Sequence, residues 1–309
     1  MANPTQRDAF WEALYEIAFH DRNTYLVCAD MGAPALDKFR RDLTNQYIDV
    51  GIAEQQGAAV AAGLALEGKK VYVYAIAPFI TMRCYEHSRV NLSTMNLPVT
   101  LVGVGSGVSY DDSGPTHHTV DDLSIMRILP HFTVHNCTDA VMAAALADIS
   151  HKATGPDYVR LDRGKLDEVY DEGQDFTDGL AVVEPGDQIC LVATGNMVQR
   201  AREVSAELAK RSISAGVVDV YRLPINGPKL VDAVSSAGRI FTMEEHSLPG
   251  GLGSAVCEVL ADAGVMKPIK RIGMNFSDGY CYKYGGRENI QSLYGLDAGS
   301  IVETVVGSM

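Results

Sequence analysis

The chain has 309 residues, 47% of them hydrophobic and 21% charged, which is the composition of a globular protein with about two domains of roughly 150 residues each. The net charge is −13 and the lysines and arginines are scattered, so we expect neither a nucleic-acid surface nor a basic membrane-binding face. Apolar runs fall short of the ~20 residues of a membrane span, and Met-Ala-Asn-Pro at the N-terminus does not resemble a signal peptide.

The six cysteines are widely spaced and form no C-x-x-C pair. This spacing argues against a zinc knuckle or a redox motif. Most of them lie in apolar segments, as is typical of buried free thiols in a reducing compartment. We therefore expect a cytoplasmic protein with no metal site of its own.

Strand and helix patterns alternate through the first half of the chain. Strands are expected at 25–29, 46–50, 70–76, 98–104, 131–135 and 157–161, and helices at 6–20, 54–66, 79–95, 121–128 and 138–151. Continuous apolar strands that alternate with helices indicate a buried parallel sheet.

Residues 164–188 interrupt this alternation, and their acidic stretch 167–175 is interpreted as a linker that crosses the surface. The alternation then resumes. Strands are expected at 189–193, 214–220, 239–243 and 268–272, and helices at 196–210, 228–236, 251–263 and 297–305. The predicted fold class is α/β, with one parallel-sheet domain at 1–165, a linker at 166–182 and a second, smaller domain at 183–309.

Glu54 is the carboxylate that stands out in the first domain. It lies in the segment IDVGIAEQQG, between apolar residues and a helix rich in alanine. Burying a carboxylate is costly, so a site usually carries that cost when it needs a proton-sharing acid. Taken alone, however, Glu54 is explained as well by an acid that complements a helix dipole.

A glycine-rich loop follows the strand at 98–104 and reads GVGSGVSYDDSGPTHH. A loop in this position lies at the carboxyl edge of a parallel sheet, where ligands bind. Its glycines let the backbone approach a ligand closely. The spacing does not match a dinucleotide fingerprint, and the adjacent His117 and His118 are a poor chelating pair.

Several segments together resemble the transketolase family. The resemblance is carried by IDVGIAEQQGAAVAAG, GPTHH and DYVRLDRGKL in the first domain, and by VVDVYRLPINGPKL, EEHSLPGGLGSA and YGLDAGSIVETV in the second. Their order and spacing correspond to the pyrimidine-binding domain followed by the C-terminal domain of that family. The Gly-Asp-Gly segment and following Asn that bind diphosphate and magnesium in thiamine enzymes are absent. The chain therefore resembles the C-terminal subunit of a split, two-subunit transketolase.

This resemblance implies thiamine diphosphate as the cofactor, with Mg²⁺ or Ca²⁺ held mainly by an N-terminal partner subunit. It places Glu54 at the glutamate that hydrogen-bonds the aminopyrimidine ring, a role that needs a buried acid with an available proton. Phe79, or less directly Tyr85, corresponds to the aromatic platform under the pyrimidine, and the alternative for both is core packing. Asp30 follows a strand and faces the cofactor or the partner. Arg83 and Cys84 are expected to be neighbours of the site rather than participants.

The resemblance also implies a substrate site for a sugar phosphate or a similar anionic ketose. His117 matches a histidine that contacts sugar hydroxyls near the reacting carbon. Arg163 and Arg7 match arginines that bind the sugar phosphate, and their guanidinium groups suit such an anion. A surface or strand-end ion pair is the alternative for each arginine. Two copies of each subunit are expected, since the cofactor of this family lies between protomers.

Departures from the family lie in the substrate channel. Ser113 stands where many members have an aspartate, and Gly105 stands where some have a histidine. The role of His118 and that of the tyrosine-rich segment 278–289 are left open. The rival interpretations are the beta subunit of a 2-oxo-acid dehydrogenase, a deoxyxylulose-phosphate-synthase-like enzyme, and a non-catalytic scaffolding subunit.

Overall fold

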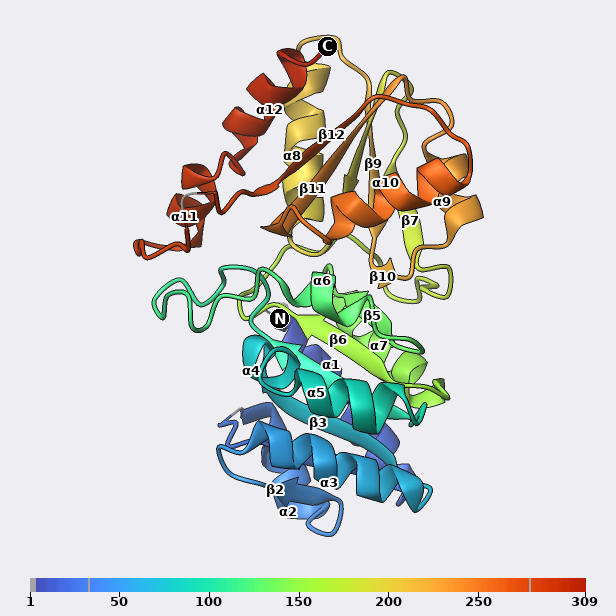
Figure 1. Cartoon of the computed structure of the whole chain (residues 1–309), viewed down its shortest axis with the longest axis vertical. Coiled ribbons are helices and arrows are strands. Elements are labelled where there is room, and N and C mark those ends of the chain that lie inside the picture. Colours follow the sequence, from blue (N-terminus) through green and yellow to red (C-terminus); the bar gives the residue numbers. More distant parts are fainter. Residues whose placement is uncertain (1–3, 33, 278) are drawn as a thin grey trace.

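The computed structural model describes residues 4–32, 34–277 and 279–309. The chain forms two α/β units in succession, and each unit is built on its own sheet (Figure 1). Within the described residues, no helix combines the length and the apolar character needed to cross a bilayer.

The first sheet has seven strands in the order β10-β5-β6-β4-β3-β1-β2. These are β1 (Thr24–Cys28), β2 (Tyr47–Asp49), β3 (Lys70–Ile76), β4 (Val99–Val104), β5 (Thr133–Asn136), β6 (Asp157–Leu161) and β10 (Arg222–Leu223). All neighbours are parallel except β10 and β5. The central strands β3, β4 and β6 are buried almost throughout, which explains their continuous apolar sequences.

Helices cover both faces of this sheet (Figure 1). The helical segments are α1 (Gln6–His20), η1 (Pro34–Leu36), α2 (Asp37–Asp42), α3 (Glu54–Leu66), α4 (Ala77–Thr81), α5 (Tyr85–His87), η2 (Ser88–Ser93), α6 (Asp122–Met126) and α7 (Ala140–Lys152). One apolar core lies under α1 and α7, around Trp11 and Leu146, and the other lies under α3 and α4, around Ala61 and Ile80. The expected single helix at 79–95 is wrong, because the segment is divided into α4, α5 and a π-helix, η2.

The second sheet has five strands in the order β12-β11-β8-β9-β7. These are β7 (Leu180–Glu184), β8 (Ile189–Ala193), β9 (Ala215–Val220), β11 (Arg239–Ser247) and β12 (Ile269–Met274), with β7 antiparallel to β9. The helices are α8 (Met197–Ala209), α9 (Gly227–Ala233), α10 (Leu252–Asp262), α11 (Arg287–Leu293) and α12 (Ala298–Val306). The strand β7 lies inside the segment that was expected to lack regular structure, so that expectation is wrong there.

The carboxyl ends of the parallel strands in the first sheet meet at one edge, where polar residues collect. Asp30 follows β1, Glu54 follows β2, Phe79 follows β3, and Arg163 follows β6. The loop at 105–120 follows β4 at the same edge. An edge of this kind is where open α/β sheets bind ligands.

Candidate active site

Glu54 is the first residue of α3, and its carboxylate is only 4% exposed. Gly51 takes a positive φ of 67° in the turn that leads into the helix. Gly57, one turn further along, is buried where α3 faces Val73 of β3. The helix N-terminus favours a negative group, but a buried carboxylate still needs a partner.

Arg83 supplies that partner. Its Nη1 donates a hydrogen bond to Glu54 Oε2 over 2.8 Å. The same guanidinium lies over the Phe79 ring, with its central carbon 4.2 Å from the ring centroid. Arg83 therefore contacts both of the residues proposed to lie at the cofactor, and its expected place as a neighbour of the site stays a prediction.

Phe79 lies in α4 and connects this pair to His117. The two ring centroids are 5.1 Å apart, in an edge-on arrangement. His117 Nδ1 lies 2.9 Å from the hydroxyl of Thr116, which leaves Nε2 for other partners. Tyr85 instead lines a separate groove with Arg89 and Ile128.

The Cys84 thiol is buried beside α4. Its Sγ donates to the carbonyl oxygen of Phe79 over 3.3 Å. Burial raises the pKa of the Cys84 thiol to about 12. Such a thiol is inert near neutral pH, in agreement with its expected place beside the chemistry.

Tyr110 continues the series of contacts on the other side of His117. Its ring centroid lies 5.8 Å from that of His117, and the guanidinium of Arg163 stands 4.5 Å from the Tyr110 centroid. Arg163 Nη1 donates to Asp112 Oδ1 over 3.2 Å, and Ser113 Oγ donates to the same oxygen over 2.9 Å. Sequence reasoning did not single out Tyr110.

Arg7 approaches the same group from α1. It pairs with Asp8 over 3.1 Å. Burial alone would lower the pKa of Arg7, but Asp8 and the phenols of Tyr74 and Tyr110 oppose that effect and raise the pKa overall. Arg7 and Arg163 therefore both act on Tyr110. Asp30 lies apart, exposed, with a φ of 49°, and its backbone N–H donates to Asp49.

The structure thus unites most of the predicted site residues in one unbroken series of contacts. In order, the series is Glu54, Arg83, Phe79, His117, Tyr110, Arg163, Asp112 and Ser113. A buried acid stands at one end, and Arg163, paired with Asp112, stands near the other. This arrangement suits a ligand that needs proton transfer at one end and carries an anion at the other.

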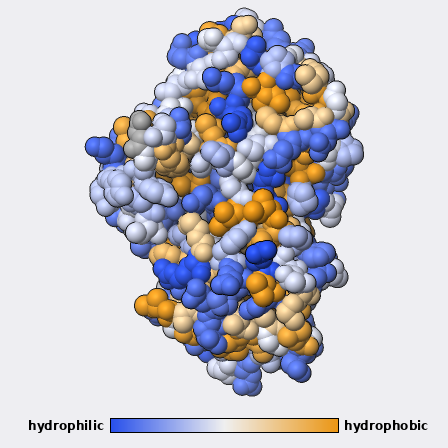
Figure 2. All heavy atoms as spheres, in the orientation of Figure 1, coloured by the Kyte–Doolittle hydropathy of each residue, from blue (hydrophilic) through white to orange (hydrophobic). Residues whose placement is uncertain are grey.

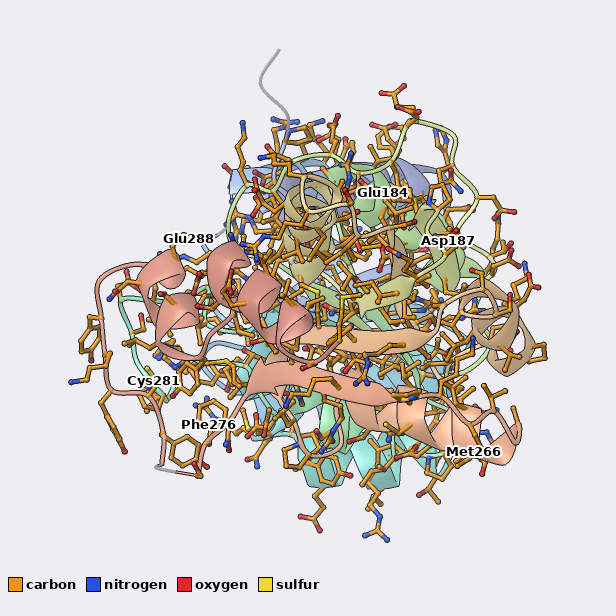
Figure 3. All side chains as sticks on the ribbon, turned by 90° about the horizontal axis from the view of Figure 1, so that it is seen from above. Glu184, Asp187, Met266, Phe276, Cys281 and Glu288 are labelled. Carbon is orange, nitrogen blue, oxygen red and sulfur yellow. The ribbon has the colours of Figure 1, made fainter. Side chains whose placement is uncertain are left out.

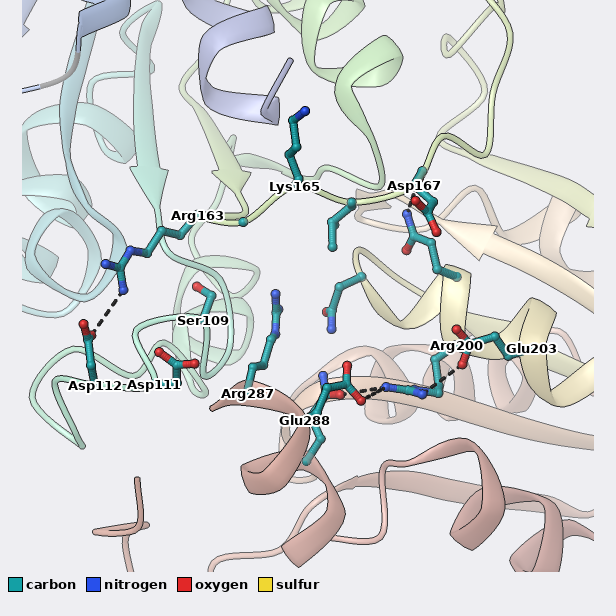
Figure 4. A pocket seen from close by; sticks show the side chains of 15 residues that line it. Ser109, Asp111, Asp112, Arg163, Lys165, Asp167, Arg200, Glu203, Arg287 and Glu288 are labelled. Atoms are coloured by element: carbon teal, nitrogen blue, oxygen red, sulfur yellow. Dashed lines mark hydrogen bonds and ion pairs between the residues drawn. The ribbon is translucent and has the colours of Figure 1, made fainter. Parts of the chain in front are cut away.

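A polar cleft of about 600 Å³ begins at the Arg163 end of this series (Figure 4). Arg163 and Asp112 line its first-sheet side, and Arg200, Arg287 and Glu288 line the side that belongs to the second sheet. Neither Glu54 nor His117 lines the cleft. The cleft therefore adjoins the anion end of the site, not the end with the buried acid.

Arg287 ties the two sheets together beside this cleft. Its Nη2 lies 2.7 Å from Asp162 Oδ2 and 2.6 Å from Glu245 Oε2. Asp162 precedes Arg163, and its backbone N–H donates to Gln6 Oε1 over 2.7 Å, next to Arg7. The ion pairs of Arg287 thus support the backbone that carries both arginines. No motif pointed to this residue.

The sequence left open the roles of His118 and of the tyrosine-rich segment 278–289. His118 directly follows the GPTH residues 114–117, and part of the segment lies beside them. His118 is buried, and that burial lowers the pKa of its imidazole. Tyr280, Tyr282 and Tyr284 are exposed, and the Tyr284 hydroxyl lies close to Gly114. Asp278, the first residue of the tyrosine-rich segment, lies outside the described residues. Within those residues, no group of three or more His, Cys, Asp or Glu side chains lies together as a metal site.

The two sheets, with their covering helices, define the chain as an α/β protein with two successive sheet units. Residues 2–168 match the family described as "Transketolase, pyrimidine binding domain", and residues 179–301 match "Transketolase, C-terminal domain". The chain belongs to the transketolase family.

Curated relatives agree with this assignment. An apulose-4-phosphate transketolase subunit of Actinobacillus succinogenes is 33% identical, over 90% of this chain and 89% of that protein. A 6-deoxy-6-sulfo-D-fructose transketolase subunit of Clostridium sp. (strain MSTE9) is 31% identical, over 96% and 92%. The 1-deoxy-D-xylulose-5-phosphate synthase 2 of Geobacter sulfurreducens is 36% identical over 94% of this chain, but the match spans only 47% of that longer protein.

Among solved structures, a split-gene transketolase described as an inactive beta4 tetramer superimposes with a TM-score of 0.87 at 30% identity, over 99% of this chain and 98% of that one. The transketolase of Pichia stipitis has the same fold, with a TM-score of 0.80 at 20% identity over 46% of its chain. The chain is therefore a C-terminal subunit of the split type, and its family uses thiamine diphosphate.

Proposed function

We propose that this transketolase subunit uses Glu54 and His117 to transfer a two-carbon ketol unit from an anionic ketose to an aldose. The observation that carries the proposal is the buried Glu54 carboxylate, joined through Arg83 and Phe79 to His117 at the carboxyl edge of the first sheet. The proposed division into domains at 1–165 and 183–309, with the linker 166–182 between them, belongs to the same proposal.

The residues at Glu54 fit the aminopyrimidine end of thiamine diphosphate. Glu54 Oε2 is paired with Arg83, and Oε1 has no hydrogen-bond partner among the residues that the structure describes. The half-buried Phe79 ring offers a flat apolar surface beside it. Glu54 and Phe79 would thus hold the ring, with Tyr85 and Asp30 as further candidates toward the cofactor.

When bound, thiamine diphosphate supplies the carbanion-forming thiazolium carbon that carries the two-carbon unit. Glu54 holds a proton for a ring nitrogen in a place that is largely closed to water. Arg83 occupies Oε2, so Oε1 is the oxygen left to meet that ring nitrogen. His117 is oriented by Thr116, and its Nε2 donates to or accepts from a substrate hydroxyl.

The anionic end of the substrate is assigned to Arg163 and Arg7, with Ser113 on the same loop. Arg163 is exposed enough to meet a ligand, since its side chain is 42% accessible, and its partner Asp112 is more exposed still. Relatives that act on a sugar phosphate and on a sulfosugar, by their names, support an anionic ketose. A pentose phosphate is one member of that class.

A second chain completes the proposed site. This partner subunit would hold the diphosphate together with Mg²⁺ or Ca²⁺. The relatives whose names describe one subunit of a transketolase support the same arrangement, and two copies of each chain are proposed. A cytoplasmic location remains part of the proposal.

The experiment is ketol transfer by the complex, purified from the native host through a tagged copy of this chain. We expect transfer from an anionic ketose by the complex, and neither transfer nor tight thiamine diphosphate binding by the isolated chain. Tight stoichiometric binding by the isolated chain in calorimetry would contradict the two-subunit proposal. A complex that binds cofactor but releases no aldose product would favour the scaffolding alternative. Use of a 2-oxo acid as the donor would favour the synthase or dehydrogenase alternatives.

A further inference from the structure

The ring of Tyr110 occupies the space directly over the backbone of Gly105. Gly105 has a φ of 101°, and a Cβ placed on it would overlap the Cδ2 and Cε2 atoms of Tyr110. The position of Gly105 is held by Thr119, whose hydroxyl donates to the Gly105 carbonyl over 2.8 Å. The absence of a side chain at 105 therefore makes room for the aromatic ring in this loop.

The Tyr110 ring stands between the two functional ends of the site. His117, next to the proposed reacting end, lies 5.8 Å away between ring centroids. Arg163, at the proposed anion end, lies over the ring at 4.5 Å. A substrate that reached from His117 to Arg163 would have the Tyr110 ring beside the stretch between its two ends.

The hydroxyl of Tyr110 is available to that substrate. It has no hydrogen-bond partner among the described residues, although the side chain is half-buried. Burial raises the pKa of Tyr110, while the charges of Arg163 and Arg7 oppose the rise without cancelling it. The phenol therefore keeps its proton near neutral pH and is a hydrogen-bond donor.

We propose that Tyr110 is a specificity-determining residue that contacts the substrate and donates a hydrogen bond to a hydroxyl in the middle of the ketose chain. The inference rests on the proposed function, because it needs a ketose bound between His117 and Arg163. It narrows the substrate class to anionic ketoses that carry a hydroxyl between the reacting carbons and the anionic group. The ring has a second role, since it supports the flat face of the Arg163 guanidinium.

The test compares Tyr110→Phe and Tyr110→Ala in the complex purified from the native host. The donors are fructose 6-phosphate and 6-deoxy-6-sulfofructose, each beside analogues that lack the hydroxyl at carbon 4 or at carbon 5. The measured quantity is the ratio of kcat/KM between each donor and its deoxy analogue. Tyr25→Phe is the matched control, because Tyr25 is also half-buried but lies at the amino end of β1, away from the site.

We expect Tyr110→Phe to lower that ratio by about 5–50-fold for one of the two positions, because the variant loses one donor. Tyr110→Ala should in addition raise KM for every anionic donor, since Arg163 loses its support. The control should keep the wild-type ratio.

Unchanged ratios in Tyr110→Phe would overturn the inference and leave the proposed function standing. An equal loss on every donor and analogue would also overturn it, since that is the behaviour of a general packing residue. A wild-type complex that uses none of these donors but transfers from uncharged ketoses would contradict the proposed anionic-ketose substrate, and this inference with it.

Discussion

The Nη1 atom of Arg83 lies 2.8 Å from Glu54 Oε2, and the same guanidinium covers the ring of Phe79 at 4.2 Å. The Arg83 side chain therefore balances the charge of the buried Glu54 carboxylate and also covers a face of the Phe79 ring. Arg83 is 44% exposed and has room to move toward solvent. Arg83 thus contacts both of the residues that the proposed function places at the cofactor ring.

Replacing Arg83 by Met should destabilise the isolated chain by about 1–3 kcal/mol, because the carboxylate of Glu54 is left buried without its partner. Adding Glu54→Gln should recover most of that loss, since both charges are then gone. Urea unfolding of the wild type, the two single variants and the double variant gives the coupling energy. A coupling energy near zero would mean that the pair does not stabilise the fold.

Glu54→Gln should lower kcat of the complex by about 10²–10⁴-fold, because an amide does not supply the shared proton. The fold should remain intact, since Gln has nearly the same shape and no buried charge. Steady-state kinetics, with circular dichroism as the check on folding, measure both. Activity within about threefold of the wild type would remove Glu54 from the mechanism.

Much of the fold could be predicted because buried parallel strands have continuous apolar sequences. The strands β3 and β4 and the helices α1 and α3 lie within a residue or two of their predicted bounds. The strands β7 and β10 were missed for a common reason. Both are antiparallel partners at the edge of a sheet, and their pairing depends on a distant strand rather than on their own sequence.

The candidate site was predicted unevenly. Glu54, Phe79, His117 and Arg163 were found through motifs, and the structure places them in one series of contacts. Arg83 was expected to be a neighbour of the site, and its contact with Glu54 exists only after α4 packs beside α3. Long-range contacts of this kind have no period or spacing in the sequence.

Arg163→Ala should raise KM for the anionic donor by about 10–100-fold and change kcat little, because the anion is bound in both the ground state and the transition state. Arg211→Ala is the control, since Arg211 is a similarly exposed arginine paired with Glu303 far from the site. Measuring KM with a phosphorylated and with an unphosphorylated ketose separates a loss of anion binding from a general loss of substrate binding. If the variant and the wild type prefer the phosphorylated ketose equally, Arg163 does not bind the anion.

The pH dependence of stability should contain a contribution from Asp219. Burial, aided by the charge of Asp139, raises the pKa of Asp219 from 3.8 to about 7, although Thr138 and Tyr170 donate hydrogen bonds to Oδ2. The folded chain therefore holds a proton that the unfolded chain releases, and the free energy of unfolding falls as pH rises from about 4 to about 7. Asp219→Asn should flatten this fall by a few kcal/mol in urea titrations. Parallel curves for both proteins would show that Asp219 is ionised in the folded chain.

Ile52→Asp should prevent assembly with the partner while leaving the fold intact. Ile52 lies two residues before the buried Glu54, yet it is 78% exposed, and Leu66, Val90 and Met95 add further exposed apolar groups on α3, on η2 and after η2. In Figure 2, hydrophobic residues (orange) are visible at several places on the lower part of the molecule, where α3 and α5 lie. Exposed apolar side chains that recur on one face are typical of an interface that another subunit covers.

Met266→Asp is the matched control for this assembly prediction. Met266 is 92% exposed, but it lies in the loop between α10 and β12, across the molecule from Phe276 and Cys281 (Figure 3). Native mass spectrometry of co-purified subunits should detect the assembly with wild type and Met266→Asp, and free chains with Ile52→Asp. Because the proposed site is completed only by the partner, Ile52→Asp should lose ketol transfer together with assembly. An Ile52→Asp chain that still assembles would place the partner on another face, and Glu54 would then have to meet its cofactor with no second chain next to it.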